Sequence, residues 1–116
     1  MAGQKNWEVD QNTTFRFTVE YKDDSGIPVS LVGASAKMQV RDTKGGSKLA
    51  FTLTSQPAGG ITIDGSAGKL TIIMNPAQTN KLFYPKSSYD IMLTDSNGTK
   101  TKLVEGFITL SRSVTI

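Results

Sequence analysis

The side chains that could do chemistry are few, and most of them lie in polar loops. Asp23 and Asp24, with Asp10 or Glu20, could supply the oxygen ligands that calcium prefers. Their spacing lacks the alternating acids of a dedicated calcium loop, so a plain turn is the stronger interpretation. Residues 64–69 resemble a phosphate-binding loop, but their glycines are three apart and Leu70 follows the lysine. This second segment is predicted to be a hairpin turn.

Composition removes most catalytic chemistry. The chain contains no cysteine and no histidine. It therefore has no disulfide, no ordinary zinc site and no Ser–His or Cys–His nucleophile pair. No carboxylate pair or lysine occurs in a recognisable catalytic context. We expect a protein that is not an enzyme, with no catalytic, metal-binding or cofactor-binding residues.

Charge and hydropathy argue against nucleic acid and membrane as partners. The net charge is only +3, from 13 Lys and Arg against 10 Asp and Glu. Lys37 and Arg41 share one strand face with Gln39, but the aromatic residues nearby in the pattern occupy core positions and are not free to stack on bases. No apolar run exceeds three residues, whereas a membrane helix needs about 20.

The elements that must position these side chains are strands. Apolar residues alternate with polar ones from Phe15 to Tyr21, and strict alternation of this kind buries one face of a strand. Similar runs recur along the chain, separated by turns rich in Gly, Asp, Asn and Ser; they cover 36–41, 49–54, 61–63, 70–74, 89–94 and 103–110. About seven or eight short strands predict an all-β antiparallel sandwich or a small barrel.

One segment breaks the strand rhythm. Asn75 can cap a helix and Pro76 suits its first turn, so a short helix is expected to cross between the sheets there. Asn97-Gly98 is a strong hairpin signal between the last two strand-like runs. The core is expected to include Phe15, Phe17, Val19, Met38, Val40, Phe51, Leu53, Leu70, Ile72, Ile91, Leu93 and Phe107.

The two ends of the chain and three aromatic residues are the candidate contact sites. Residues 1–6 are small and polar and are expected to form a flexible N-terminal arm on a single domain spanning 7–116. The β-prone end of the chain either pairs inside the domain or offers an edge to a partner. Trp7, Phe83 and Tyr84 fall outside the core period, where they either anchor an interface or close the ends of the sandwich. The candidate partner-binding residues are Trp7, Phe83, Tyr84, Val114 and Ile116.

The order of these motifs resembles small tailed-phage virion proteins and the N-terminal attachment domains of phage upper-baseplate and tail-fibre proteins. The resemblance covers nearly the whole chain. Its most specific part is a polar strand, a D-x-G-x-P turn and an M-Q-V-R strand; the matching segments are 12–19, 24–33, 34–41, 61–64, 68–72, 89–98 and 103–106. It implies an immunoglobulin-like β-sandwich that docks onto other virion proteins in several copies, with no enzymatic residues.

The resulting expectation is a non-catalytic adaptor in the tail, baseplate or fibre junction of a phage particle. Its partners would be other virion proteins, with self-association inside the assembly as a further option. It would be made in the host cytoplasm and located in the virion. A fibre protein would continue past Ile116, so a free-standing component is expected. Two alternatives remain: a capsid decoration protein, and a carbohydrate-binding module using Trp7, Tyr84 and Tyr89.

Overall fold

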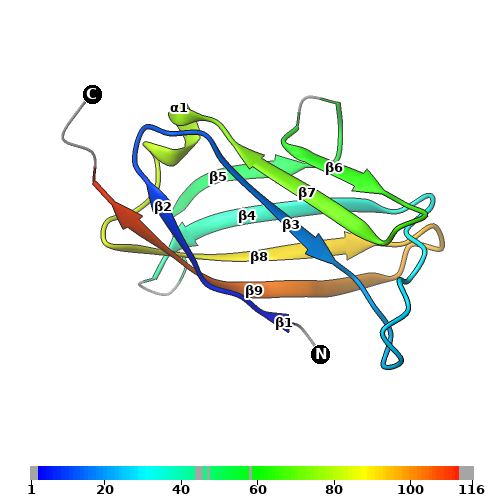
Figure 1. Cartoon of the computed structure of the whole chain (residues 1–116). Helices are drawn as coiled ribbons and strands as arrows, with labels where there is room; N and C mark the ends of the chain where they lie inside the picture. Colours follow the sequence, from blue (N-terminus) through cyan, green and yellow to red (C-terminus); the bar gives the residue numbers. More distant parts are fainter. Residues whose placement is uncertain (1–2, 44–45, 47, 58, 113–116) are drawn as a thin grey trace.

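The protein is a sandwich of two β-sheets in a computed structural model that describes residues 3–43, 46, 48–57 and 59–112 (Figure 1). The larger sheet has the strand order β1-β9-β8-β4-β5, with β2 also paired to β9, and the smaller sheet has the order β3-β7-β6. The strands are β1 (Gly3–Gln4), β2 (Trp7–Asp10), β3 (Phe15–Glu20), β4 (Ser35–Asp42), β5 (Leu49–Thr54), β6 (Ile61–Asp64), β7 (Lys69–Met74), β8 (Lys86–Thr94) and β9 (Lys100–Ser111).

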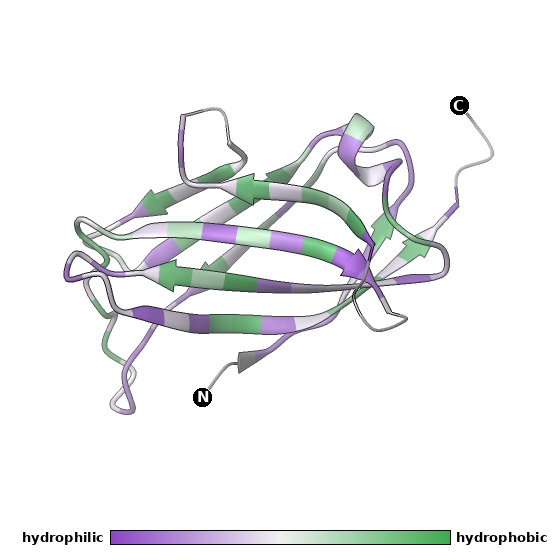
Figure 2. Cartoon of the chain, turned by 180° about the vertical axis from the view of Figure 1, so that it is seen from behind, coloured by the Kyte–Doolittle hydropathy of each residue, from purple (hydrophilic) through white to green (hydrophobic). Residues whose placement is uncertain are grey.

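The alternation of apolar and polar residues in the sequence determines which face of each strand is buried. Buried and more exposed side chains alternate along β4, β7 and β8, so each strand turns one row of side chains into the interlayer core. Figure 2 shows the same alternation as hydrophilic and hydrophobic bands along the strands. The strand pattern predicted from the sequence is therefore confirmed, and the core lies between the sheets.

The N-terminal segment runs alongside the last strand. Strands β1 and β2 both pair with β9 in parallel, whereas every other strand pair is antiparallel within the described part of the chain. In the two residues between β1 and β2, the Lys5 N–H donates to the Glu105 carbonyl at 3.0 Å, and Asn6 Oδ1 accepts from the Phe107 N–H at 3.0 Å. Residues 3–6 belong to the segment 1–6 that was expected to form a flexible N-terminal arm, and in the structure they are hydrogen-bonded to β9. Polar side chains do not prevent this, because the backbone makes most of the contacts.

A β-bulge in β9 overturns one core expectation. Ile91 pairs with Val104 and Met92 with Lys102, which leaves Leu103 as an extra residue. Leu103 and Val104 are therefore both buried, and from there Ile108 and Leu110 face inward. Phe107 consequently points outward and is 38% exposed, so its assignment to the core was wrong. Phe15 is partly buried against the core, and the other expected core residues are buried.

The connections follow the predicted turn chemistry. The short helix α1 (Pro76–Thr79) has Asn75 as its N-cap, with a capping box to Gln78. Strands β8 and β9 form the expected hairpin, in which Gly98 has a φ of +86°. Within the described ranges, no helix has the length and hydropathy to cross a membrane.

Candidate functional site

Trp7 lies in the wall of the core. Its indole stacks on Phe17 with ring centroids 4.4 Å apart, and its Nε1–H donates to the Tyr89 hydroxyl at 2.8 Å. That hydroxyl in turn donates to the Lys5 carbonyl at 2.7 Å. Burial raises the pKa of Tyr89 to about 12, although the hydrogen bond from Trp7 acts in the opposite direction. The chain Trp7–Tyr89–Lys5 therefore fixes the N-terminal segment against the core.

Phe83 and Tyr84, two neighbouring candidate contact residues, differ in exposure. Phe83 is half-buried, and its N–H donates to Ser87 Oγ at 2.8 Å. Tyr84 is 56% exposed, and the Arg112 guanidinium lies over its ring at 4.1 Å. Val114 and Ile116 lie outside the described residues. Of the described candidate residues, Trp7 and Phe83 are partly buried and Tyr84 is exposed.

Three loops at one end of the sandwich begin with an aspartate that organises its own turn. Asp23 Oδ1 accepts from the N–H groups of Ser25 at 2.9 Å and Ile27 at 3.0 Å. Asp95 Oδ1 accepts from two backbone N–H groups in the same way, at 2.9 Å each. Asp64 Oδ1 accepts from the Ala67 N–H at 3.4 Å. These carboxylates therefore hold turns, as the sequence predicted for residues 64–69.

The acidic residues weighed for a cation do not gather. Glu20 pairs instead with Lys22 at 3.1 Å and with Lys69 at 3.8 Å. The hydrogen bond with Lys22 and its charge, together with the charge of Lys69, lower the pKa of Glu20. Among the described residues, no group of three or more carboxylates could hold a metal ion.

The first of the same three loops packs against each of the other two. A side chain at Gly65 would come within 3.0 Å of the Val32 backbone, and one at Gly33 would come within 3.1 Å of Ser96 Cβ. The Leu31 N–H donates to the Gly65 carbonyl at 2.8 Å. These close approaches require small residues at the loop contacts.

Two aliphatic side chains are exposed on this hydrogen-bonded framework. Val32 is 69% exposed and Ile27 is 60% exposed. The segment that carries Ile27 projects beyond the strands as a small hairpin after β3 (Figure 1). We use the name loop end for residues 21–34, 64–68 and 95–99. The exposed side chains of Ile27 and Val32 belong to the first of these segments. Sequence analysis missed the loop end because the pattern alone does not show that Val32 and Ile27 lie outside the core.

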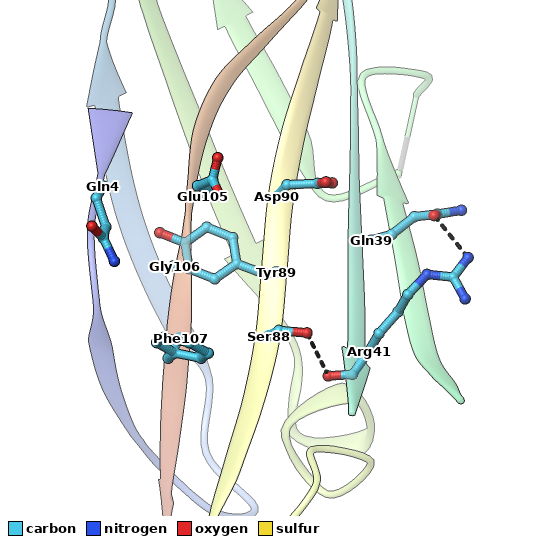
Figure 3. A pocket seen from close by; sticks show the side chains of 9 residues that line it. All are labelled: Gln4, Gln39, Arg41, Ser88, Tyr89, Asp90, Glu105, Gly106 and Phe107. Atoms are coloured by element: carbon cyan, nitrogen blue, oxygen red, sulfur yellow. Dashed lines mark hydrogen bonds between the residues drawn. The ribbon is translucent and has the colours of Figure 1, made fainter. Parts of the chain in front are cut away.

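A shallow trough occupies the outer face of the larger sheet, on the side away from the core (Figure 3). Its volume is about 270 Å³. One row of cross-strand partners runs across it: Gln4 opposite Glu105, Glu105 opposite Asp90, and Asp90 opposite Gln39. The next row places Phe107 opposite Ser88 and Ser88 opposite Arg41. The small Ser88 side chain between two large ones leaves the hollow.

Polar contacts hold one wall of the trough. Arg41 donates through Nη2 to Gln39 Oε1 at 3.0 Å and through Nη1 to the Gly46 carbonyl at 3.2 Å. Ser88 Oγ donates to the Asp42 carbonyl at 2.9 Å. On the opposite wall, Lys86 Nζ lies 4.9 Å from the centre of the Phe107 ring. The trough thus combines an accessible aromatic ring with fixed hydrogen-bonding groups.

Comparisons with known proteins establish the fold and no family. No protein-family model matches the chain, and no curated protein matches it. Among solved structures, it is similar to the crystal structure of CopC from Methylosinus trichosporium OB3b, with a TM-score of 0.52 and 14% sequence identity. The match covers 96% of this chain and 88% of that chain. The all-β, immunoglobulin-like sandwich predicted from the sequence is therefore confirmed.

Proposed function

We propose that this chain is a non-catalytic structural protein of a tailed-phage particle, where it acts as an adaptor in the tail, baseplate or fibre junction. The proposal starts from the resemblance of the sequence to small virion proteins and attachment domains. The observation that carries the docking role is the loop end, where two exposed aliphatic side chains stand on a hydrogen-bonded framework.

The physical case rests on preorganisation. Burying an exposed aliphatic side chain in a partner contributes about 1.5–3 kcal/mol. Association normally loses part of such a gain because mobile loops must be ordered. At the loop end the Asp23 and Asp95 turns and the Gly65–Val32 and Gly33–Ser96 contacts already order the backbone. Val32 and Ile27 are therefore the side chains through which the loop end would dock another virion protein.

The test is incorporation of variants into particles that lack the wild-type protein. Val32→Asp should reduce incorporation at least about tenfold, because a carboxylate would be buried without a partner. The matched control is Leu49→Asp, which makes the same change at an exposed aliphatic residue on β5. Both substitutions should leave the free energy of unfolding within about 0.5 kcal/mol of wild type.

The control also separates the outcomes. Loss of incorporation with Leu49→Asp but not with Val32→Asp would place the interface on β5 and refute the loop-end assignment. Normal incorporation of both variants and of an Ile27→Asp/Val32→Asp double variant would refute docking through exposed aliphatic residues.

A further inference from the structure

Strand β3 is an edge of the smaller sheet, because among the described strands it pairs only with β7 (Figure 1). The Tyr21 N–H donates to the Gly68 carbonyl at 2.7 Å, in the same register as the β3–β7 ladder. Hydrogen-bonded positions alternate along an antiparallel strand, so every second residue of β3 turns its N–H and carbonyl groups away from β7. The residues that face away are Arg16, Thr18 and Glu20.

The side chains of these three residues are exposed, and two of them are charged. Arg16 has no ion-pair partner within the described ranges, and Glu20 contacts Lys22 at 3.1 Å and Lys69 at 3.8 Å. Both contacts of Glu20 are exposed and therefore weak. Charged side chains usually keep an edge strand from pairing at random. Here, however, the two charges have opposite signs and lie equally far from Thr18 on either side.

This symmetry makes β3 complementary to a second copy of itself. When two copies run antiparallel about a two-fold axis at Thr18, Arg16 lies opposite Glu20 at two positions and Thr18 lies opposite Thr18. On the core side, the same register places Phe17 opposite Val19, which is a favourable aromatic and β-branched pair. An axis at Arg16 or at Glu20 would instead oppose like charges, so the charges select one register.

Two rows of side chains on the outer face of the smaller sheet continue across this axis. Cross-strand partners form these rows, which are Asp64–Lys69–Glu20 and Thr62–Thr71–Thr18. A second copy adds Arg16 to the first row, which then alternates in charge, and it adds another Thr18 to the second row. We propose that two copies of this chain associate through β3 and thereby join their three-stranded sheets into one, with the strand order β6-β7-β3-β3-β7-β6.

The backbone holds the two copies together, and the side chains set the register. In the proposed pairing, the outward N–H and carbonyl groups make up to about six hydrogen bonds between the copies. Strands β1 and β2 pair with β9 in the other sheet, so they make no ladder with β3. The contact uses the same surface on both copies, so it closes as a dimer and does not propagate into a fibre.

Two measurements on the purified protein detect this dimer. Sedimentation velocity from about 0.01 to 0.5 mM should show a shift from the 12.5 kDa of one chain to twice that mass. Hydrogen exchange at the amides of Arg16, Thr18 and Glu20 should slow as the concentration rises. The amides of Phe17 and Val19 face β7 and should change less.

Charge reversal tests the register. Arg16→Glu and Glu20→Arg should each weaken self-association at least about tenfold, because like charges then face each other at two positions. A mixture of the two variants restores opposite charges at both positions, so the mixed dimer should form with a Kd within about threefold of wild type. The matched control is Lys37→Glu, which reverses a charge on the exposed face of β4 and should associate like wild type.

This inference is independent of the proposed phage role. Circular dichroism at low concentration checks that both variants are folded before they are mixed. A single 12.5 kDa species over the whole concentration range would overturn the inference. A dimer that both reversals leave intact would also overturn it, as would a mixture of the two folded variants that stays monomeric while the wild type dimerises.

Discussion

Gly106 is predicted to be the residue that lets the N-terminal segment lie against β9. Its backbone φ is not in the left-handed region, so alanine would be acceptable in isolation. A Cβ at this position, however, would collide with the Lys5 carbonyl oxygen, and Asn6 Oδ1 would lie at 2.9 Å. Gly106→Ala should therefore displace residues 3–6 while leaving the sandwich folded.

The magnitude follows from the hydrogen bonds that this displacement breaks. They run from Lys5 N–H to Glu105, from the Tyr89 hydroxyl to Lys5, and from Phe107 N–H to Asn6. At about 1 kcal/mol each, the expected loss in free energy of unfolding is about 2–3 kcal/mol. Displacing Lys5 also removes the carbonyl oxygen to which the buried Tyr89 hydroxyl donates.

Urea denaturation measures the loss, and hydrogen exchange locates it. The amide of Phe107 should exchange faster in Gly106→Ala. Gly26→Ala is the control, because its Cβ would meet nothing within 4 Å and only the positive φ of +80° is strained; it should cost about 1 kcal/mol. Equal stability of Gly106→Ala and wild type, with unchanged exchange at Phe107, would refute the reasoning.

Three further predictions test the core and its connections. Tyr89→Phe should be less stable than wild type at neutral pH by about 1–2 kcal/mol. In the wild type, the stabilisation from the protonated Tyr89 hydroxyl is present below pH 10 and should fall by roughly 2–3 kcal/mol as the pH rises toward the folded-state pKa of about 12. Urea denaturation measured at several pH values should therefore show a shallower decline in the variant than in the wild type. Ile91→Ala should cost about 2–5 kcal/mol in urea denaturation, because Ile91 is fully buried; a loss under 1 kcal/mol would contradict its place in the core. Asn75→Ala should cost about 1 kcal/mol by removing the cap of α1, and calorimetry showing no change in melting temperature would argue against the cap.

The sequence was sufficient for features set by local chemistry. Alternation along β4 and β8 predicted which side chains face the core, and Asn75-Pro76 predicted the helix. The Asn97-Gly98 hairpin was also predicted, because glycine accepts the positive φ that the turn requires. Each of these features depends on residues that are close together in the sequence, so the sequence alone was enough to predict it.

Features that depend on distant segments were not predictable. Phe107 was misplaced because the bulge at Leu103 reverses the inward face of β9. The pairing of residues 3–10 with β9 joins segments about 100 residues apart, and the sequence of residues 3–10 alone does not indicate which strand they pair with. Both candidate sites were missed for the same reason, because each is formed by segments that are distant in the sequence. The trough is formed by four strands and the loop end by three loops.

Mass spectrometry of heads and tails separated from purified particles, with copy number, tests the virion role most directly. The proposed function predicts recovery in the tail fraction, at a copy number that matches the rotational symmetry of the tail. Recovery with heads in large excess would instead identify a decoration protein. Absence from both fractions would contradict a structural role in the particle.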